Sequence, residues 1–390
     1  MPGKLHTTAP TGDRAYLVAA DLPGAVIAAE DSLEELAELA TSAGARVVGA
    51  TIQRRRTPTA ATYIGKGKLE EVGADRQELG ANVVIFDDEL SPSQQRNLEE
   101  ELGIKVLDRT ALILDIFATR ASTREGKLQV ELAQMQYLLP RLAGQWSHLE
   151  RMEGAIGTRG PGETQIETDR RLVRSRIDRL RKDLKKVQTQ RELYRRQRRR
   201  SQVPVVALVG YTNAGKSTIM RRLSGANVLA ANKLFATLDP VTRRVNLEGG
   251  DVFLLSDTVG FIQKLPTQLV AAFRATLEEL TEAHLLLHVV DVSHPHAADQ
   301  AEVVARTLEA IGAGDRRRVL VLNKADRLLD QGIPGVEELA ALARDIGDLD
   351  AAAEAAVAIS ATKEWGLAEL KRVIEERLAP AATQAWSAGR

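Results

Sequence analysis

The sequence contains no cysteine, which excludes disulfides, zinc ribbons, thiolate-bound iron–sulfur clusters and thiol nucleophiles. It has no run of 18 or more apolar residues, so we expect no transmembrane helix. The first residues lack the apolar core of a signal peptide, and the six histidines show no spacing typical of metal ligands. We therefore expect a cytoplasmic protein without stable membrane association. Its 390 residues are enough for two or three domains.

The net charge of zero conceals an uneven distribution of charge. Residues 1–110 carry 12 basic and 18 acidic side chains, whereas residues 170–200 carry 15 basic and 3 acidic ones. A long segment of almost one sign is typical of polyanion binding, and the alternative is a solvated helix face. We favour binding to nucleic acid.

The N-terminal part alternates between strand and helix patterns. Apolar strand patterns lie at residues 15–20, 45–52, 82–86 and 105–109. Between them, Ser32 and Glu35 have the spacing of a capping box, and Pro92 after Ser91 indicates another helix start. This order predicts a small parallel sheet covered by helices over residues 15–110.

Two long helical patterns follow, and each has an apolar seam with alternating spacings of four and three, which Arg191 interrupts in the second pattern. The seam residues are Leu128, Leu132, Met135, Leu139 and Leu142 in the first pattern, and Val173, Ile177, Leu180, Leu184, Val187 and Tyr194 in the second. Two such seams predict an antiparallel helical hairpin over residues 111–200. Its Gly-rich tip, at about 144–165, is either a connector or a functional loop. Residues 1–14 and 380–390 are expected to be disordered tails.

A second set of strand patterns begins after residue 200 and indicates another α/β domain, over residues 201–379. The first strand pattern leads into Gly210, Tyr211, Thr212, Asn213, Ala214, Gly215, Lys216, Ser217 and Thr218. The first eight of these fit GxxxxGK[ST] between a strand and a helix, which predicts a phosphate-binding loop. Its glycines allow backbone N–H groups to face phosphates, Lys216 reaches the β- and γ-phosphates, and Ser217 binds Mg²⁺.

A second motif follows the strand pattern at 252–256. It consists of Asp257, Thr258, Val259 and Gly260. Asp257 can bind Mg²⁺ through water, and the N–H of Gly260 can approach the γ-phosphate closely because glycine has no side chain. A threonine upstream must cap Mg²⁺ in the triphosphate state. Thr237 and Thr242 are the candidates, and we prefer Thr237.

Two further motifs indicate the base. They are Asn323, Lys324, Ala325 and Asp326, then Ser360, Ala361 and Thr362, each after a strand pattern. A carboxylate at Asp326 can accept from N1–H and the exocyclic amine of guanine, a pair that adenine lacks. A backbone N–H after the last strand can meet guanine O6. GTP is therefore favoured over ATP, with all four motifs at strand ends.

The expected fold class is α/β, with a small parallel domain, a long helical hairpin and a P-loop GTPase domain. We assign the catalytic contacts to Lys216, Thr237 and Gly260. Phe261 stands where many GTPases have the glutamine that orients the attacking water. Because phenylalanine cannot orient water, we expect slow basal hydrolysis that a partner stimulates.

The sequence resembles the HflX family of ribosome-associated GTPases. Beyond the nucleotide motifs, the resemblance rests on TYIGKGKLEEV at 62–72, the segment at 107–142 that ends in AQMQYLLPRL, GTRGPGETQIETDRR at 157–171 and FATLDP at 235–240. These strings extend the resemblance over most of residues 15–378.

The resemblance implies binding to the large ribosomal subunit and its rRNA, with no DNA partner. It implies GTP-controlled splitting or rescue of stalled ribosomes, with the helical arm near the peptidyl transferase centre. It implies Ser217 and Thr237 as Mg²⁺ ligands, and it adds contacts to GTP from one further stretch. These contacts are Phe235, Ala236, Thr237, Leu238 and Asp239.

Two other functions stay open on the sequence. One is a GTP-switched adaptor whose hairpin binds a protein. The other is an RNA-modification GTPase, which the lack of cysteine and of a modifying domain disfavours. For an ATP site in the N-terminal domain, the sequence offers only a weak signal at Gly65 to Lys68. This segment also fits a turn or an RNA-facing element. We expect a monomer.

Overall fold

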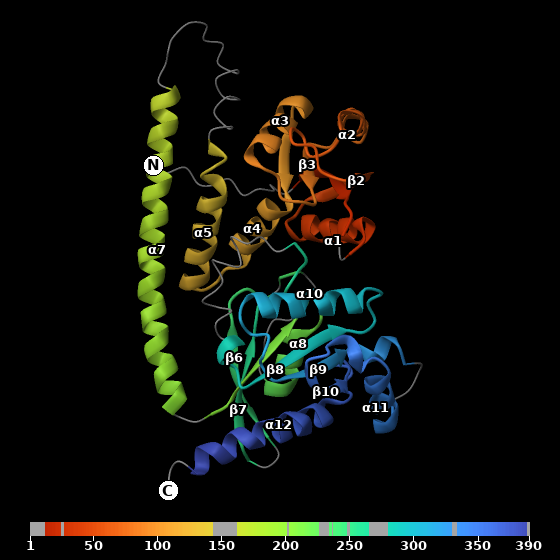
Figure 1. Cartoon of the computed structure of the whole chain (residues 1–390), viewed down its shortest axis with the longest axis vertical. Helices are drawn as coiled ribbons and strands as arrows, with labels where there is room; N and C mark the ends of the chain where they lie inside the picture. The colour runs from red at the N-terminus through yellow and green to blue at the C-terminus, as the bar shows by residue number, and fades with distance from the viewer. Residues whose placement is uncertain are drawn as a thin grey trace, which may run out of the picture. The chain divides into compact units, whose positions relative to one another are not determined.

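The chain divides into two compact units, with a boundary between Lys186 and Val187, in the computed structural model (Figure 1). The structure describes residues 12–24, 27–142, 162–200, 203–225, 234–235, 237–247, 250–264, 280–329 and 334–387. Most of the expected hairpin tip, at 143–161, lies outside these ranges. Within them, no helix combines the length and the apolar character needed to cross a membrane.

The first unit contains a four-stranded parallel sheet in the order β2-β1-β3-β4. Its strands are β1 (Arg14–Asp21), β2 (Arg46–Arg54), β3 (Val83–Phe86) and β4 (Lys105–Asp108). The connecting helices are α1 (Ala29–Ser42), α2 (Lys66–Glu78) and α3 (Pro92–Leu102). Tyr16, Val84 and Phe86 of the sheet pack against Leu69 of α2 and Leu98 of α3. The predicted alternation of parallel strands and helices is confirmed.

The start of α1 differs from the prediction. Its N-cap is Ala28, so the expected capping box of Ser32 and Glu35 is wrong. The N–H of Ser32 already donates to the carbonyl of Ala28 within the helix. The Ser32 hydroxyl instead donates to buried Asp87 (2.6 Å), and Glu35 forms an ion pair with buried Arg109. These polar residues therefore serve tertiary contacts rather than the helix end.

The start of α3 is as predicted. Ser91 is its N-cap and Pro92 its first residue. The Ser91 hydroxyl accepts from the N–H of Gln94 (3.2 Å), and the Gln94 side chain accepts from the N–H of Ser91 (2.9 Å). This reciprocal pair is a capping box, which satisfies two backbone donors of the first turn.

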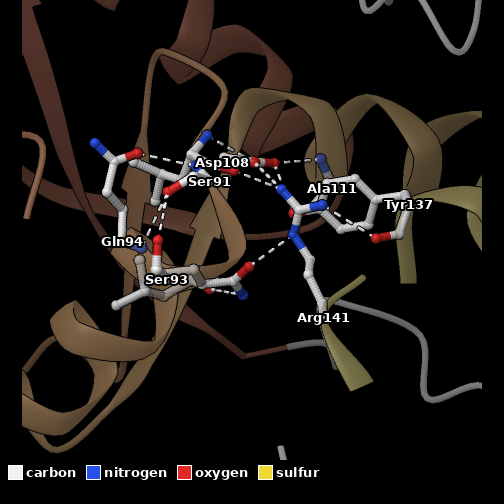
Figure 2. A network of polar contacts seen from close by, with 10 residues as sticks. Ser91, Ser93, Gln94, Asp108, Ala111, Tyr137 and Arg141 are labelled. Atoms are coloured by element: carbon white, nitrogen blue, oxygen red, sulfur yellow. Dashed lines mark hydrogen bonds and ion pairs between the residues drawn. The ribbon is translucent and has the colours of Figure 1, made fainter. Parts of the chain in front are cut away.

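A buried polar network around Asp108 links β4 to the helices beside it (Figure 2). The carboxylate of Asp108 accepts from the N–H of Ala111 (2.8 Å), the hydroxyl of Tyr137 (2.9 Å) and the guanidinium of Arg141 (3.3 Å). Arg141 also donates to the carbonyl of Leu90 (2.6 Å) and stacks on the Tyr137 ring. Burial raises the pKa of Asp108, against the opposing effect of these donors. Removing one partner would leave a buried polar group unpaired.

Helix α4 (Arg109–Arg120) follows β4 directly and is buried along most of its length. It is separate from the hairpin, which consists of α5 (Arg124–Leu138) and α7 (Gly162–Arg200). The hairpin arm predicted from residue 111 therefore begins later, at α5. Helix α7 begins at Gly162, inside the range expected for the tip loop.

The predicted seam between the two hairpin helices is confirmed for eight of its eleven residues. They form one apolar cluster: Leu128, Leu132, Met135 and the C-cap Leu139 from α5 with Val173, Ile177, Leu180 and Leu184 of α7. Leu142 and Val187 are not part of this cluster, and the side chain of Tyr194 lies outside the description. Helices α5 and α7 run side by side in Figure 1. Arg176 adds an ion pair to Glu131 across the seam (2.5 Å). The hairpin is therefore held mainly by apolar burial.

The second unit contains a six-stranded sheet in the order β10-β9-β8-β5-β7-β6. Its strands are β5 (Val205–Gly210), β6 (Val241–Asn246), β7 (Val252–Asp257), β8 (Leu285–Asp291), β9 (Arg318–Asn323) and β10 (Ala353–Ala358). Its helices are α8 (Lys216–Ser224), α10 (Ala297–Ala310), α11 (Val336–Asp345) and α12 (Leu367–Ser387), with short 3₁₀ turns η1 (Ala325–Arg327) and η2 (Gly347–Leu349). One apolar cluster includes α8 and α12, and another includes α10 and α11.

Two features of this unit differ from the sequence analysis. Strand β6 was not predicted, and it is the one strand of this sheet that pairs antiparallel within the described residues. Helix α12 runs to Ser387, so the tail expected from residue 380 continues the helix.

Candidate functional site

The loop at residues 210–217 connects the carboxyl end of β5 to the N-terminus of α8. Gly210 and Gly215 have φ angles of +153° and +102°, which favour glycine. A Cβ at Gly210 would collide with the carbonyl oxygen of Val289, and one at Gly215 with the side-chain amide of Asn323. The backbone is therefore packed tightly where a helix N-terminus favours an anion.

Lys216 is the first residue of α8 and is buried. Its ammonium donates to the carbonyls of Gly210 (3.0 Å) and Tyr211 (2.6 Å). Burial lowers the pKa of Lys216 to about 8, although the carboxylate of Asp257 opposes the shift. The amine therefore stays mostly cationic at neutral pH, as a phosphate ligand requires.

Three oxygen-bearing side chains meet beside Lys216. The Ser217 hydroxyl donates to Asp257 (2.6 Å), the Thr237 hydroxyl donates to the same carboxylate oxygen (3.1 Å), and the two hydroxyls are 2.8 Å apart. The other oxygen of Asp257, Oδ1, is buried without a hydrogen-bond partner in the described part of the chain. Hard oxygen donors around an orphaned carboxylate oxygen fit Mg²⁺.

The segment after β7 packs against the phosphate loop. The N–H of Thr212 donates to the carbonyl of Phe261 (2.8 Å), and the N–H of Phe261 donates to Gly210 (3.1 Å). A Cβ at Gly260 would lie 2.9 Å from Thr212 and 3.1 Å from the Lys216 ammonium. The apolar side chain of Phe261 is buried, and it offers no polar group at this point.

Asn323 joins two loops at the ends of β9 and β10. Its side-chain amide donates to the carbonyl of Ala214 (2.8 Å) and accepts from the N–H of Ala361 (3.1 Å). Lys324 has a φ of +65° and forms an ion pair with Asp291 (2.5 Å).

Asp326 follows in the 3₁₀ turn η1. Its Oδ1 atom is buried and has no hydrogen-bond partner in the described ranges. A buried acceptor without a partner can accept a hydrogen bond from the base of a bound nucleotide.

The loop after β10 contains the last predicted motif. The hydroxyls of Ser360 and Thr362 are 3.2 Å apart, and Ser360 accepts from the N–H of Lys363 (3.1 Å). Arg222 of α8 donates to the carbonyls of Ala361 and Thr362 (3.2 Å each). Sequence reasoning missed Arg222, because no motif signals a contact 139 residues away.

Five further residues from the sequence analysis fall into three groups. Phe235, Leu238 and Val259 are buried apolar side chains. Ala236 lies outside the described residues. Thr242 lies on β6 with its hydroxyl 3.5 Å from Ser256, so it does not join the Ser217 cluster as Thr237 does.

Basic side chains cover the face of α7 opposite its apolar seam. Arg174, Arg179 and Lys182 are exposed, whereas Ile177 and Leu180 between them are buried. The side chains beyond residue 190 lie outside the description, so the most basic stretch of the sequence is not assigned to a face.

Three family models match successive parts of the chain. The model described as GTP-binding GTPase N-terminal matches residues 30–118, and the one described as GTP-binding GTPase Middle Region matches 120–198. Residues 205–324 match the model described as 50S ribosome-binding GTPase.

The chain is also similar to curated proteins. It is 54% identical to GTPase HflX of Alkalihalophilus pseudofirmus over 78% of this chain and 72% of the relative. It is 50% identical to GTPase HflX of Escherichia coli over 77% of this chain and 70% of the relative. A solved GTP-binding protein from Sulfolobus solfataricus in complex with GDP is 25% identical, with 96% and 99% of the two chains covered and a TM-score of 0.47.

The identity to curated relatives extends through both units. The family models match strands β2 to β4 of the N-terminal sheet, the hairpin, and the nucleotide motifs up to Lys324. The chain is accordingly a GTPase that binds GTP and GDP with Mg²⁺, and it belongs to the HflX family.

Proposed function

We propose that this chain associates with the large ribosomal subunit through rRNA and uses GTP to split or rescue stalled ribosomes. The observation that carries the proposal is the combination of a guanine-nucleotide site with a 39-residue helix that exposes Arg174, Arg179 and Lys182. The printed description of the matching model, 50S ribosome-binding GTPase, supports the same partner. The protein acts as a monomer in the cytoplasm.

At the phosphate end, Lys216 binds the β- and γ-phosphates while the loop N–H groups surround them. Ser217 and Thr237 would hold Mg²⁺, and Asp257 would bind it through water. The ion would supply positive charge beside the transferred phosphoryl group. Gly260 brings its N–H to the γ-phosphate. Glycine is needed at this position because any side chain would collide with Thr212.

At the base end, Asp326 accepts from N1–H and the exocyclic amine of guanine. The loop at Ser360–Thr362 supplies a backbone N–H to guanine O6. Asn323 holds this loop and the phosphate loop together (2.8 and 3.1 Å).

Hydrolysis by the isolated protein is slow under this proposal. Phe261 is buried and cannot orient water, and the catalytic contacts of Lys216, Thr237 and Gly260 stabilise charge without activating the nucleophile. The ribosome supplies or orders the missing group, so that turnover is coupled to binding.

Co-sedimentation with large ribosomal subunits tests the partner. We expect more protein to pellet with a non-hydrolysable GTP analogue than with GDP. The variant carrying Arg174→Gln, Arg179→Gln and Lys182→Gln should pellet less, and the slope of log affinity against log salt should fall by up to about 3. Equal pelleting with both nucleotides would overturn GTP control.

A matched control removes the same charge from the second unit. It carries Arg306→Gln, Arg344→Gln and Lys371→Gln, on α10, α11 and α12. This variant should pellet like the original protein. An equal loss in both variants would mean that net charge, not the α7 surface, determines the binding. If α7 binds protein rather than rRNA, the α7 variant should have the same salt slope as the original protein.

A further inference from the structure

One arginine connects the helix at the phosphate end of the site to the loop at the base end. Arg222 lies in the second turn of α8, which begins at Lys216. Its Nε atom donates to the carbonyl of Ala361 (3.2 Å), and one of its Nη atoms donates to the carbonyl of Thr362 (3.2 Å). The other Nη atom forms an ion pair with Glu364. All three donor groups of the guanidinium are therefore used on one loop.

These contacts determine which way the loop peptides face. In a planar trans peptide, the carbonyl and the following N–H point in opposite directions. By binding the carbonyl of Ala361, Arg222 turns the N–H of Thr362 away from itself. Asn323 meanwhile accepts from the N–H of Ala361 (3.1 Å). The loop is thus fixed from both sides by side chains of other elements.

We infer that Arg222 is a positioning residue for the recognition of guanine O6, an inference that rests on the proposed role of the loop at Ser360–Thr362. Arg222 does not touch the nucleotide. It holds the loop amides in the orientation in which one of them donates to O6.

The chemistry of the side chain favours arginine over lysine at this position. The guanidinium is a rigid fork with five N–H donors, so it can bind two carbonyls and a carboxylate together. A lysine ammonium is a compact charge that cannot span these acceptors in the same geometry. The Arg222 side chain is 34% exposed, so the contact works through hydrogen-bond geometry rather than through burial.

Titration calorimetry of the full chain with three diphosphates tests the inference. GDP is compared with 6-thioguanosine diphosphate, whose sulfur is a poor acceptor in place of O6, and with IDP, which lacks the amine that Asp326 reads. The original protein should prefer GDP over both analogues. Arg222→Ala should reduce the preference over the thio analogue by about three- to tenfold, the value of one hydrogen bond. Its preference over IDP should stay unchanged.

Two further variants complete the experiment. Arg222→Lys should behave like Arg222→Ala, because charge alone does not hold the loop. Arg221→Ala, the neighbouring arginine on the same helix, should leave both preferences unchanged, because no described contact of its side chain reaches the loop. Thermal unfolding of each variant checks that it is folded.

Three results would overturn the inference. They are an equal weakening of all three ligands in Arg222→Ala, a full preference retained in that variant, and an original protein that does not distinguish the thio analogue. The ligands contain no ribosome, so the ribosomal proposal can fail or hold independently of these titrations.

Discussion

At the scale of single residues, two carboxylate oxygens support the proposed site. Asp257 and Asp326 each have an Oδ1 atom that is buried without a hydrogen-bond partner in the described chain. Leaving a buried acceptor unpaired costs about 1–3 kcal/mol, so such atoms are rare away from functional sites. Their positions at the carboxyl ends of β7 and β9 match the Mg²⁺ and guanine ends of the proposed site.

Asp326→Asn should exchange the base preference. An amide can donate to O2 of xanthine but cannot accept from both donors of guanine. We expect GDP affinity to fall by roughly 10- to 100-fold, the value of hydrogen bonds to a charged group, and XDP affinity to rise. Competition titrations measure both. The control Asp345→Asn, at the end of α11, should change neither, and unchanged GDP affinity in Asp326→Asn would contradict the assignment.

Among the elements, the α5–α7 hairpin depends on its apolar seam. Leu180 of α7 is 1% exposed, whereas Leu172 on the same helix is 61% exposed. Leu180→Ala should destabilise the first unit by about 2–5 kcal/mol, because it removes buried methyl groups and leaves a cavity. Leu172→Ala, the same change on the same helix, should stay within about 0.5 kcal/mol.

Urea unfolding monitored by circular dichroism at 222 nm compares the two variants. GDP affinity should be unchanged in both, because every nucleotide motif lies in the second unit. Equal destabilisation by the two substitutions would mean that the seam contributes little to stability.

The elements also show how far a sequence can be interpreted. Strongly periodic segments were predicted correctly, including most of the hairpin seam and every strand of the two sheets except β6. Strand β6 was missed because VTRRVN has two exposed arginines and pairs only at a sheet edge. The start of α1 was misplaced because Ser32 imitates a helix cap, while its hydroxyl contacts Asp87, 55 residues away.

For the site, motif spacing identified the residues that lie at strand ends. Lys216, Ser217 and Asp257 were named from local patterns, because each motif carries its own turn chemistry. Arg222 could not be named in this way, since its role exists only once α8 packs beside the loop after β10. Contacts between distant segments leave no periodic signal.

For the whole molecule, the boundary between the two units falls within the basic helix α7, and every nucleotide motif follows that helix in the chain. A fragment that begins at residue 201 loses all 15 basic residues of the 170–200 segment. It should bind GDP like the full chain, because its sheet and apolar clusters are its own. It should bind ribosomes poorly and show little ribosome-stimulated turnover.

Malachite-green measurement of phosphate release, with and without ribosomes, checks this expectation. The full chain serves as the control at each salt concentration. Full stimulation of the fragment would show that the hairpin is not needed, and loss of GDP binding would show that the unit does not fold alone.

The two hydrogen bonds of Asn323 have a consequence for how the site responds to partial occupancy. One side chain binds both the carbonyl of Ala214 and the N–H of Ala361. The phosphate loop and the base loop should therefore become ordered together. A ligand that orders one loop lowers the entropic cost of ordering the other, and thermodynamic reciprocity makes the benefit equal in both directions. Guanosine and pyrophosphate, offered as separate molecules, should therefore bind with positive cooperativity. The intact nucleotide receives that coupling free energy from within one molecule.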